Sequence, residues 1–182
     1  GDSQADNSDE TYTFILCTIC PVKQTKANLH YVPEEKLFHD VLGGNSSKHT
    51  WNPSRTNNLD LACKAIDGTI LNPGDEFSFN KIVGERTKEK GYLGAIVYTD
   101  GGKSEAQEGG GICQVATTVF NAVYDAGYPV PTRHNHSLYI ASYPAGRDAA
   151  VSWDELDLVW KNDGASDVLM RTSYTDTSVT VT

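Results

Sequence analysis

The sequence predicts an α+β fold with a mostly antiparallel β-sheet and two main helices. Two windows, residues 57–68 and 112–126, carry apolar residues at three- and four-residue steps, which is the helical period. About seven short segments rich in β-forming residues surround these windows, with turn residues between them. Helices and strands do not alternate as they do in βαβ units, which argues for an antiparallel sheet rather than a parallel one.

The first helix is expected over residues 57–68, "NNLDLACKAIDG". Asn57 or Asn58 is expected to cap its start, and Gly68 to follow its last turn. Cys63 falls on the apolar face of this helix, so we expect it to be a small buried side chain. The second helix is expected to follow the three glycines at 109–111 and to end at Gly127.

The strands are expected on both sides of these helices. Residues 45–56 have the composition of a loop, and a Pro-Gly turn precedes an alternating stretch that contains Phe77 and Phe79. The expected strands lie at residues 11–19, 36–44, 76–79, 91–102 and 136–143, and then in "AAVSW", "LDLVWKN", "DVLMRTSYT" and "SVTVT".

Composition narrows the range of partners. The chain has 182 residues, 15 basic and 24 acidic side chains, and a formal net charge of −9. This balance disfavours nucleic acid, whose phosphates require a basic surface. No apolar run is long enough to span a membrane. Cys17 and Cys20 form a C-x-x-C pair, but on a strand they would face opposite sides, so we expect no shared metal.

The chain is expected to divide into three parts. Residues 1–10 are polar and acidic and are expected to form a disordered leader. Residues 11–53 are expected to be an N-terminal hairpin or the end of an upstream module, and residues 54–182 the main domain. Because the sequence begins without Met, we expect it to be a mature or excised piece.

The stretch "GGGICQ" places one thiol, Cys113, at the start of the second helix. A helix N-terminus offers unpaired N–H groups and a partial positive charge, which favour a thiolate. Amide N–H groups of Gly110 and Gly111 are candidates to hold an oxyanion, and Gln114 is a candidate for a further donor. The alternative interpretation is a buried cysteine that only packs.

A nucleophilic thiol needs a base, and the sequence offers two histidines, His134 and His136. His136 is expected to open a strand, and Asp148 to lie on the next strand and orient the imidazole. The order of Cys, His and Asp suits a thiol acyl-transfer triad. It is loosely similar to the order in papain-like and transglutaminase-like enzymes, so a core of that kind is expected by analogy.

Four stretches together resemble the VanW domain family, which is named from a gene in vancomycin-resistance clusters. They are "NLDLACKAIDGTILNPGDEFSFNKIVGERTKEKGY", "GGGICQVATTVFNAVYDAGY", "RHNHSLYIASYPAGRDAAV" and "DLVWKND". The resemblance covers roughly residues 54–171 and implies a bacterial, cell-envelope protein that is extracellular or wall-associated. His136 is the better candidate for the base, because position 134 is variable in the family. The matched positions also include Arg86, Thr117 and Arg147.

Arg86 is a candidate to hold a substrate carboxylate with its two-pronged guanidinium, or else it forms an ion pair. Arg147 is expected to pair with a carboxylate, and a pairing with Asp148 would remove that residue as the orienter of His136.

Three functions are compatible with these residues. In the first, Cys113, His136 and Asp148 carry out acyl transfer or hydrolysis on peptidoglycan or a related peptide, with no cofactor. In the second, the glycine loop and the helix N-terminus bind a cell-wall peptide without catalysis. The third and weakest is a metal site of Cys113 with the histidine pair. We expect no metal, and the sequence does not specify the oligomeric state.

Overall fold

The computed structural model describes residues 17–18, 38, 40–98 and 104–182, and it confirms the α+β class. Every strand pair among the described residues is antiparallel. The strands form two three-stranded sheets, in the orders β1-β8-β3 and β2-β10-β9, and two pairs, β4-β7 and β5-β6. The bounds are β1 Cys17–Thr18, β2 Asn45–Lys48, β3 Ile70–Leu71, β4 Glu76–Ser78, β5 Gly94–Tyr98, β6 Ser104–Glu108, β7 Val159–Lys161, β8 Val168–Leu169, β9 Thr172–Tyr174 and β10 Ser178–Val181.

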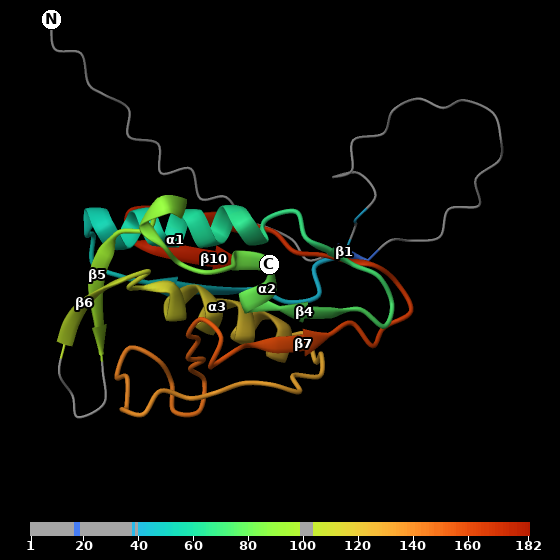
Figure 1. Cartoon of the computed structure of the whole chain (residues 1–182). Helices are drawn as coiled ribbons and strands as arrows, with labels where there is room; N and C mark the ends of the chain where they lie inside the picture. The colour runs from blue at the N-terminus through green and yellow to red at the C-terminus, as the bar shows by residue number, and fades with distance from the viewer. Residues whose placement is uncertain (1–16, 19–37, 39, 99–103) are drawn as a thin grey trace, which may run out of the picture.

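Three α-helices and one 3₁₀ turn complete the described part of the chain. They are α1 (Pro53–Ile66), α2 (Phe79–Val83), the 3₁₀ turn η2 (Lys88–Lys90) and α3 (Ile112–Asp125). The two main predicted helices, α1 and α3, contact each other, and α3 also contacts β2 and β10. Figure 1 shows the β5-β6 pair at the left end of the molecule and the β4-β7 pair in the right half of the view.

The hydrophobic core lies between the helices and the sheets. Helix α3, which carries Cys113, is buried along most of its length, as expected for a helix enclosed on several sides. Its fully buried residues include Val115, Val119 and Val123, which face α1 and the strands. Phe77, Phe79 and Trp160 are also fully buried, and the rings of Phe77 and Trp160 stack at 6.0 Å. The two phenylalanines thus have the core role that their alternation predicts.

Helix α1 begins four residues earlier than predicted, at Pro53. Asn52 is its cap, and its side chain accepts a hydrogen bond of 3.0 Å from the N–H of Arg55. The prediction that Asn57 or Asn58 caps the helix is therefore wrong. Asn58 is instead fully buried and donates to the carbonyls of Leu93 and Gly110, at 2.8 and 3.0 Å.

Three strand predictions are also wrong. In "AAVSW", residues 149–153 form no strand, and only Ala150 and Ser152 take part in isolated bridges. Residues 40–44 form no strand, and the strand of this region is β2, within a stretch whose composition is typical of a loop. Its polar residues form a strand because β10 offers an open edge, and Ser46 lies opposite Thr180 in the ladder. Residues 137–143 form turns and irregular backbone, although "HSLYIASY" alternates, because no neighbouring strand pairs with them.

Some predictions fall outside the described residues. Of the strand expected at 11–19, only Cys17–Thr18 is described, and it pairs with β8. Cys20, the leader at 1–10 and most of the hairpin expected at 11–53 are not described, so the domain boundaries stay predictions. None of the described helices has the length and apolar character needed to cross a membrane.

Candidate functional site

The glycine run forms a tight turn that delivers the chain from β6 into α3. Gly109 and Gly111 have φ values of 75° and 103°, which side-chain-bearing residues rarely adopt. A Cβ on Gly110 would overlap the carbonyl of Ala95, and a Cβ on Gly109 would lie 2.7 Å from Cβ of Arg86. All three glycines are therefore required by conformation or by close packing. The turn fixes Cys113 as the second residue of α3.

A polar stripe on α3 binds the extended segment 147–151. Cys113, Thr117 and Asn121 are spaced four residues apart and so lie on one face of the helix. Each of the three contacts a residue of the segment, and these partners run in the opposite direction along the chain, two residues apart. The Cys113 sulfur lies 3.4 Å from the carbonyl of Val151, and Thr117 Oγ1 accepts from the N–H of Ala149 at 2.9 Å. The Asn121 amide donates to the carbonyl of Arg147 at 2.7 Å. The stripe thereby sets the position of Asp148 relative to Cys113.

Cys113, His136 and Asp148 come together at this helix start. Nδ1 of His136 lies 2.7 Å from Oδ2 of Asp148, and the backbone N–H of His136 donates to the same oxygen at 2.8 Å. The imidazole also lies close enough to the thiol of Cys113 to lower the pKa of the thiol, and the thiol raises the pKa of His136. Because Asp148 occupies Nδ1, Nε2 is the ring nitrogen that remains for the thiol. His136 and Asp148 lie in irregular segments, so the expectation that each lies on a strand is wrong.

The electrostatics of this group favour charge separation between sulfur and imidazole. Burial raises the pKa of Cys113, but hydrogen bonds from His136 and from the N–H of Val151, with the charges of His136 and Arg86, bring it below its ordinary value. The hydrogen bond with Cys113 raises the pKa of His136, against the effect of burial and with help from Asp148. Both directions stabilise a thiolate beside an imidazolium.

Arg133 and Tyr143 support the group, and neither was predicted from the sequence. Arg133 donates to the carbonyls of Asp148 and Gly146, at 2.8 and 2.6 Å, and its guanidinium lies 3.4 Å from the Asp148 carboxylate. The ring of Tyr143 stacks on His136 with centroids 6.5 Å apart. One feature of the sequence could have indicated Arg133, because it lies three residues before His136, the candidate base.

Several other predicted binding residues have structural partners instead. The amide of Gln114 is buried between the Arg55 guanidinium, at 2.7 Å, and Ser47 Oγ, at 3.0 Å, so its geometry does not support a donor role towards substrate. The hydroxyl of Thr117 is occupied by hydrogen bonds with the backbone of Ala149. The guanidinium of Arg147 pairs with Asp125 at 2.8 Å, which leaves Asp148 to His136.

His134 and Arg86 complete the set of predicted residues. His134 pairs with Ala150 in an isolated β-bridge. It lies two residues before His136, whose imidazole contacts Asp148. Arg86 does approach Cys113 closely enough for its charge to lower the pKa of the thiol. No group of three His, Cys, Asp or Glu side chains in the described ranges has the arrangement of a metal site.

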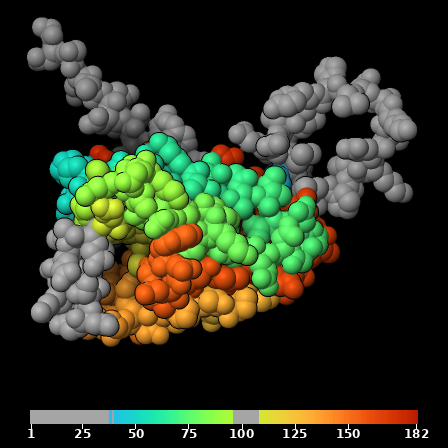
Figure 2. Space-filling model, viewed as in Figure 1, coloured from blue at the N-terminus to red at the C-terminus, as the bar shows by residue number. Residues whose placement is uncertain are grey.

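A cavity of about 460 Å³ opens beside the histidine. Its walls come from the loop 133–148 and include His136, Asp148, Tyr143 and Leu138. In the space-filling view this amber loop region lies along the lower part of the face shown (Figure 2). His136 and Asp148 therefore line a cavity that is large enough to hold part of a peptide, while Cys113 is not among its lining residues.

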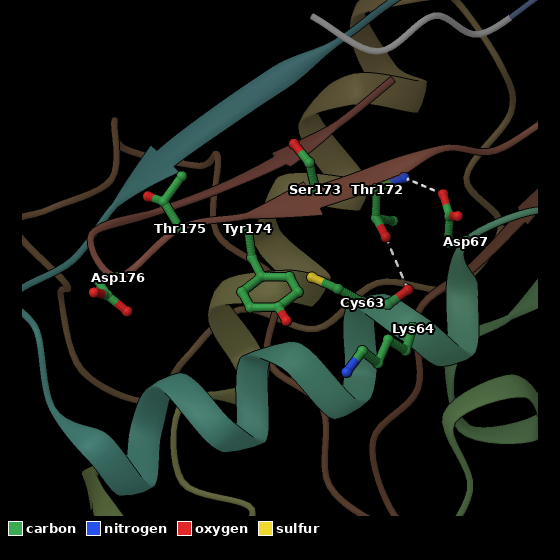
Figure 3. Close-up of a pocket in the computed structure, with 8 residues that line it drawn as sticks. All are labelled: Cys63, Lys64, Asp67, Thr172, Ser173, Tyr174, Thr175 and Asp176. Atoms are coloured by element: carbon green, nitrogen blue, oxygen red, sulfur yellow. Dashed lines mark hydrogen bonds between the residues drawn. The ribbon is translucent and has the colours of Figure 1, made fainter. Parts of the chain in front are cut away.

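A second cavity, of about 550 Å³, lies next to the other described free thiol, Cys63. Figure 3 shows this sulfur on α1, close to the ring of Tyr174, while Thr172 bonds to the Cys63 carbonyl. Burial raises the pKa of Cys63 to about 12. This thiol therefore stays protonated at neutral pH. The side chain is buried, which confirms the position predicted for it.

Comparison with known proteins places the chain in a family. The family of VanW-like proteins matches residues 54–182, and a domain family of unknown function matches residues 1–43. The chain is 40% identical over 154 residues to the uncharacterized protein YoaR of Bacillus subtilis, which covers 85% of this chain and 49% of that protein. It is 29% identical over 113 residues to the vancomycin B-type resistance protein VanW of Enterococcus faecalis, which covers 58% of this chain and 40% of that protein.

The chain thus spans about half, or less, of the length of these two relatives. No solved structure matches it, so the likeness to a papain-type core is not confirmed. The family match covers most of the chain and includes every residue of the Cys113 group. On this evidence the chain belongs to the family of VanW-like proteins.

Proposed function

We propose that this chain is a cysteine-dependent acyl-transfer or amidase-type domain that acts on peptides of the bacterial cell envelope, such as peptidoglycan stems. The observation that carries the proposal is the grouping of Cys113, His136 and Asp148, in which Asp148 lies 2.7 Å from His136 Nδ1 and the imidazole lowers the pKa of the Cys113 thiol. The substrate class rests on the family, one member of which is named as a vancomycin resistance protein. An extracellular or wall-associated location is part of the same proposal.

The proposed reaction has two halves. In the first, the Cys113 sulfur attacks an amide carbonyl, its proton passes to Nε2 of His136, and the leaving amine takes that proton as the C–N bond breaks. In the second, water or an acceptor amine attacks the thioester, loses its proton to His136, and the thiol is released and reprotonated. Asp148 holds the imidazole in the required orientation and stabilises its positive form.

The helix start supplies candidate donors for the oxyanion of each tetrahedral intermediate. No hydrogen bond to another described residue is found for the backbone N–H of Gly111 or of Cys113. The first N–H groups of a helix point out of its N-terminus, where the partial positive charge of the helix also lies. An acyl oxygen bound there would lie close to the attacking sulfur, and its developing charge would be stabilised.

The proposal is tested with soluble peptidoglycan fragments and the purified chain. Wild-type protein is expected to convert a subset of fragments, seen as new masses by mass spectrometry, and to form a trappable adduct on the peptide containing Cys113. Cys113→Ala is expected to abolish both signals. Cys63→Ala is the matched control, because that thiol is protonated and outside the proposed site, and it is expected to keep them.

Two results would reject the proposal. One is turnover of fragments that survives in Cys113→Ala, which would place the chemistry elsewhere. The other is a folded wild-type protein whose Cys113 reacts with iodoacetamide no faster than Cys63. Equal binding of fragments by wild type and Cys113→Ala, with no conversion by either, would favour a non-catalytic wall-binding module instead.

A further inference from the structure

The arginines of this chain divide into two groups by their partners. All five lie within the described residues. Three of them form ion pairs with aspartates, and these are Arg133 with Asp148, Arg147 with Asp125, and Arg171 with Asp67. Arg55 and Arg86 have no carboxylate within ion-pair distance among the described residues. These two are also the arginines that border the glycine turn.

Arg86 lies against the first glycine of the turn. A Cβ placed on Gly109 would be 2.7 Å from Cβ of Arg86, so the arginine stem packs directly on the turn. The guanidinium lies 5.5 Å above the ring of Phe79. Both of its terminal nitrogens are shielded from solvent and find no hydrogen-bond acceptor among the residues that the structure describes. A shielded guanidinium without a hydrogen-bonded carboxylate is costly, and an anion bound nearby would lower that cost.

Arg55 lies against the last glycine of the turn. A Cβ placed on Gly111 would be 2.9 Å from Cγ of Arg55 and 3.4 Å from its guanidinium carbon. One terminal nitrogen donates to the side chain of Gln114 at 2.7 Å, which fixes the plane of the guanidinium. Arg55 is partly exposed. Its remaining donors are therefore available to a ligand that enters from solvent.

We propose that Arg55 and Arg86 form a carboxylate-binding subsite at the turn 109–111, so that the substrate carries a carboxylate close to the acyl group that Cys113 attacks. This inference rests on the proposed acyl-transfer function and adds the chemical class of its substrate. Arg55 makes the direct contact through its fork of N–H groups. Arg86 acts as a positioning residue, because its charge reaches the subsite through the low-dielectric interior.

The charge balance of the chain supports a specific subsite over general attraction. With a net charge of −9, the molecule as a whole repels anions. A carboxylate would be drawn only to the place where two cations lack a carboxylate partner among the described residues and the start of α3 adds its dipole. The expected ligand is therefore a peptide with a free carboxyl group, and a neutral amide analogue is expected to bind less well.

A pair of matched alkylating reagents tests the subsite. Iodoacetate and iodoacetamide both form a bond from the Cys113 sulfur to carbon with loss of iodide, and they differ in that only iodoacetate carries a carboxylate. The rate constant of each at pH 7 is measured from the mass of the peptide containing Cys113. We expect the iodoacetate-to-iodoacetamide ratio to exceed that of glutathione by about 10-fold, a gain typical of a charge-assisted contact.

Substitutions assign that preference to the two arginines. Arg55→Gln and Arg86→Gln are each expected to lower the ratio by about 5-fold, which is typical of one lost contact to a charged group. Arg171→Gln is the matched control, since it removes an arginine paired with Asp67, and it is expected to leave the ratio unchanged. Taking the ratio cancels any change in thiolate content, because both reagents require the same thiolate.

A second measurement does not depend on the thiol. In Cys113→Ala, N-acetylglycine at ten times its Kd is expected to raise the melting temperature by about 3 °C, and N-acetylglycinamide is expected to have no effect. Arg55→Gln should remove the shift. A glutathione-like ratio together with no N-acetylglycine shift would overturn the subsite, even if Cys113 is reactive. An unreactive Cys113 with an intact N-acetylglycine shift would instead reject the proposed reaction and retain the subsite.

Discussion

The thiols of Cys63 and Cys113 both lie on helix faces that pack against the core, yet their surroundings give them opposite chemistry. Cys63 has only burial and nearby carboxylates acting on it, apart from one hydrogen bond with Thr172, and its pKa rises to about 12. Cys113 has an imidazole, a backbone N–H and a guanidinium charge acting against burial. The reactivity of each thiol is therefore decided by the polar groups that the fold brings to its sulfur, and not by its position within a helix.

This difference predicts the pH dependence of alkylation by iodoacetamide. The Cys113 rate should rise with pH through a midpoint below that of an ordinary thiol, because the pKa of Cys113 is lowered. His136→Ala removes the largest lowering interaction and leaves the effect of burial, so the midpoint should move upward. Rate profiles from about pH 5 to 10 on both proteins check this. An unchanged midpoint in His136→Ala would show that the imidazole does not act on the sulfur.

The same pair links pH to folding stability. The lowered pKa of folded Cys113 gives stability that is present above the pKa of the unfolded thiol and lost as pH falls through the folded pKa. The raised pKa of His136 gives stability that is present below its unfolded pKa and lost as pH rises through the folded pKa. Cys113→Ala should make stability fall less as pH rises through the pKa of folded His136. Urea unfolding at several pH values measures this change.

Asp148→Asn tests the orienting carboxylate. The change keeps the size of the side chain but removes the charge next to His136 Nδ1 and replaces one of the two carboxylate oxygens with an NH2 donor. We expect turnover, or alkylation of Cys113 below pH 7, to fall by about 100-fold, the lower range for a triad carboxylate. Asp125→Asn is the control, because it breaks the Arg147 pair outside the group. Equal losses in both variants would mean that Asp148 acts only through stability.

At the scale of elements, the glycine turn, α3 and the segment 147–151 act as one unit. The sequence predicted α3 and the place of Cys113 on it, because helical periodicity and glycine punctuation are local signals. It did not predict that residues 137–143 are irregular or that β2 exists. Those outcomes depend on whether a partner strand lies alongside, which local composition does not encode. Arg133 and Tyr143 were missed for the same reason, since their roles come from tertiary contacts.

Gly110→Ala tests the tightest point of this unit. Its added Cβ would overlap the backbone carbonyl of Ala95, which cannot move without shifting β5. We expect a loss of about 3 kcal/mol in the free energy of unfolding. Gly94→Ala is the matched control, because Gly94 has nothing within 4 Å of an added Cβ and no positive φ. Denaturant unfolding compares the two, and similar stabilities would contradict the close packing of the turn.

At the scale of the whole molecule, the site depends on residues from both ends of the described chain. Ser47 of β2 hydrogen-bonds Thr118 Oγ1 at 2.7 Å and the Gln114 amide at 3.0 Å, and β2 pairs with β10 near the C-terminus. The family match begins only at residue 54. The structural unit that holds α3 in place is therefore longer at its N-terminal side than the part that matches the family of VanW-like proteins.

A comparison of two fragments tests this extension. Fragment 54–182 lacks β2 and Leu42, which packs against the core, whereas fragment 40–182 keeps both. We expect the shorter fragment to lose about 3 kcal/mol of stability and about 10 °C in melting temperature, from the missing ladder, the Ser47 hydrogen bonds and the Asn52 cap of α1. Its Cys113 alkylation should also slow, because Gln114 and Arg55 lose their support next to the turn. Equal melting temperatures would show that β2 adds nothing, and the site would then be complete within residues 54–182.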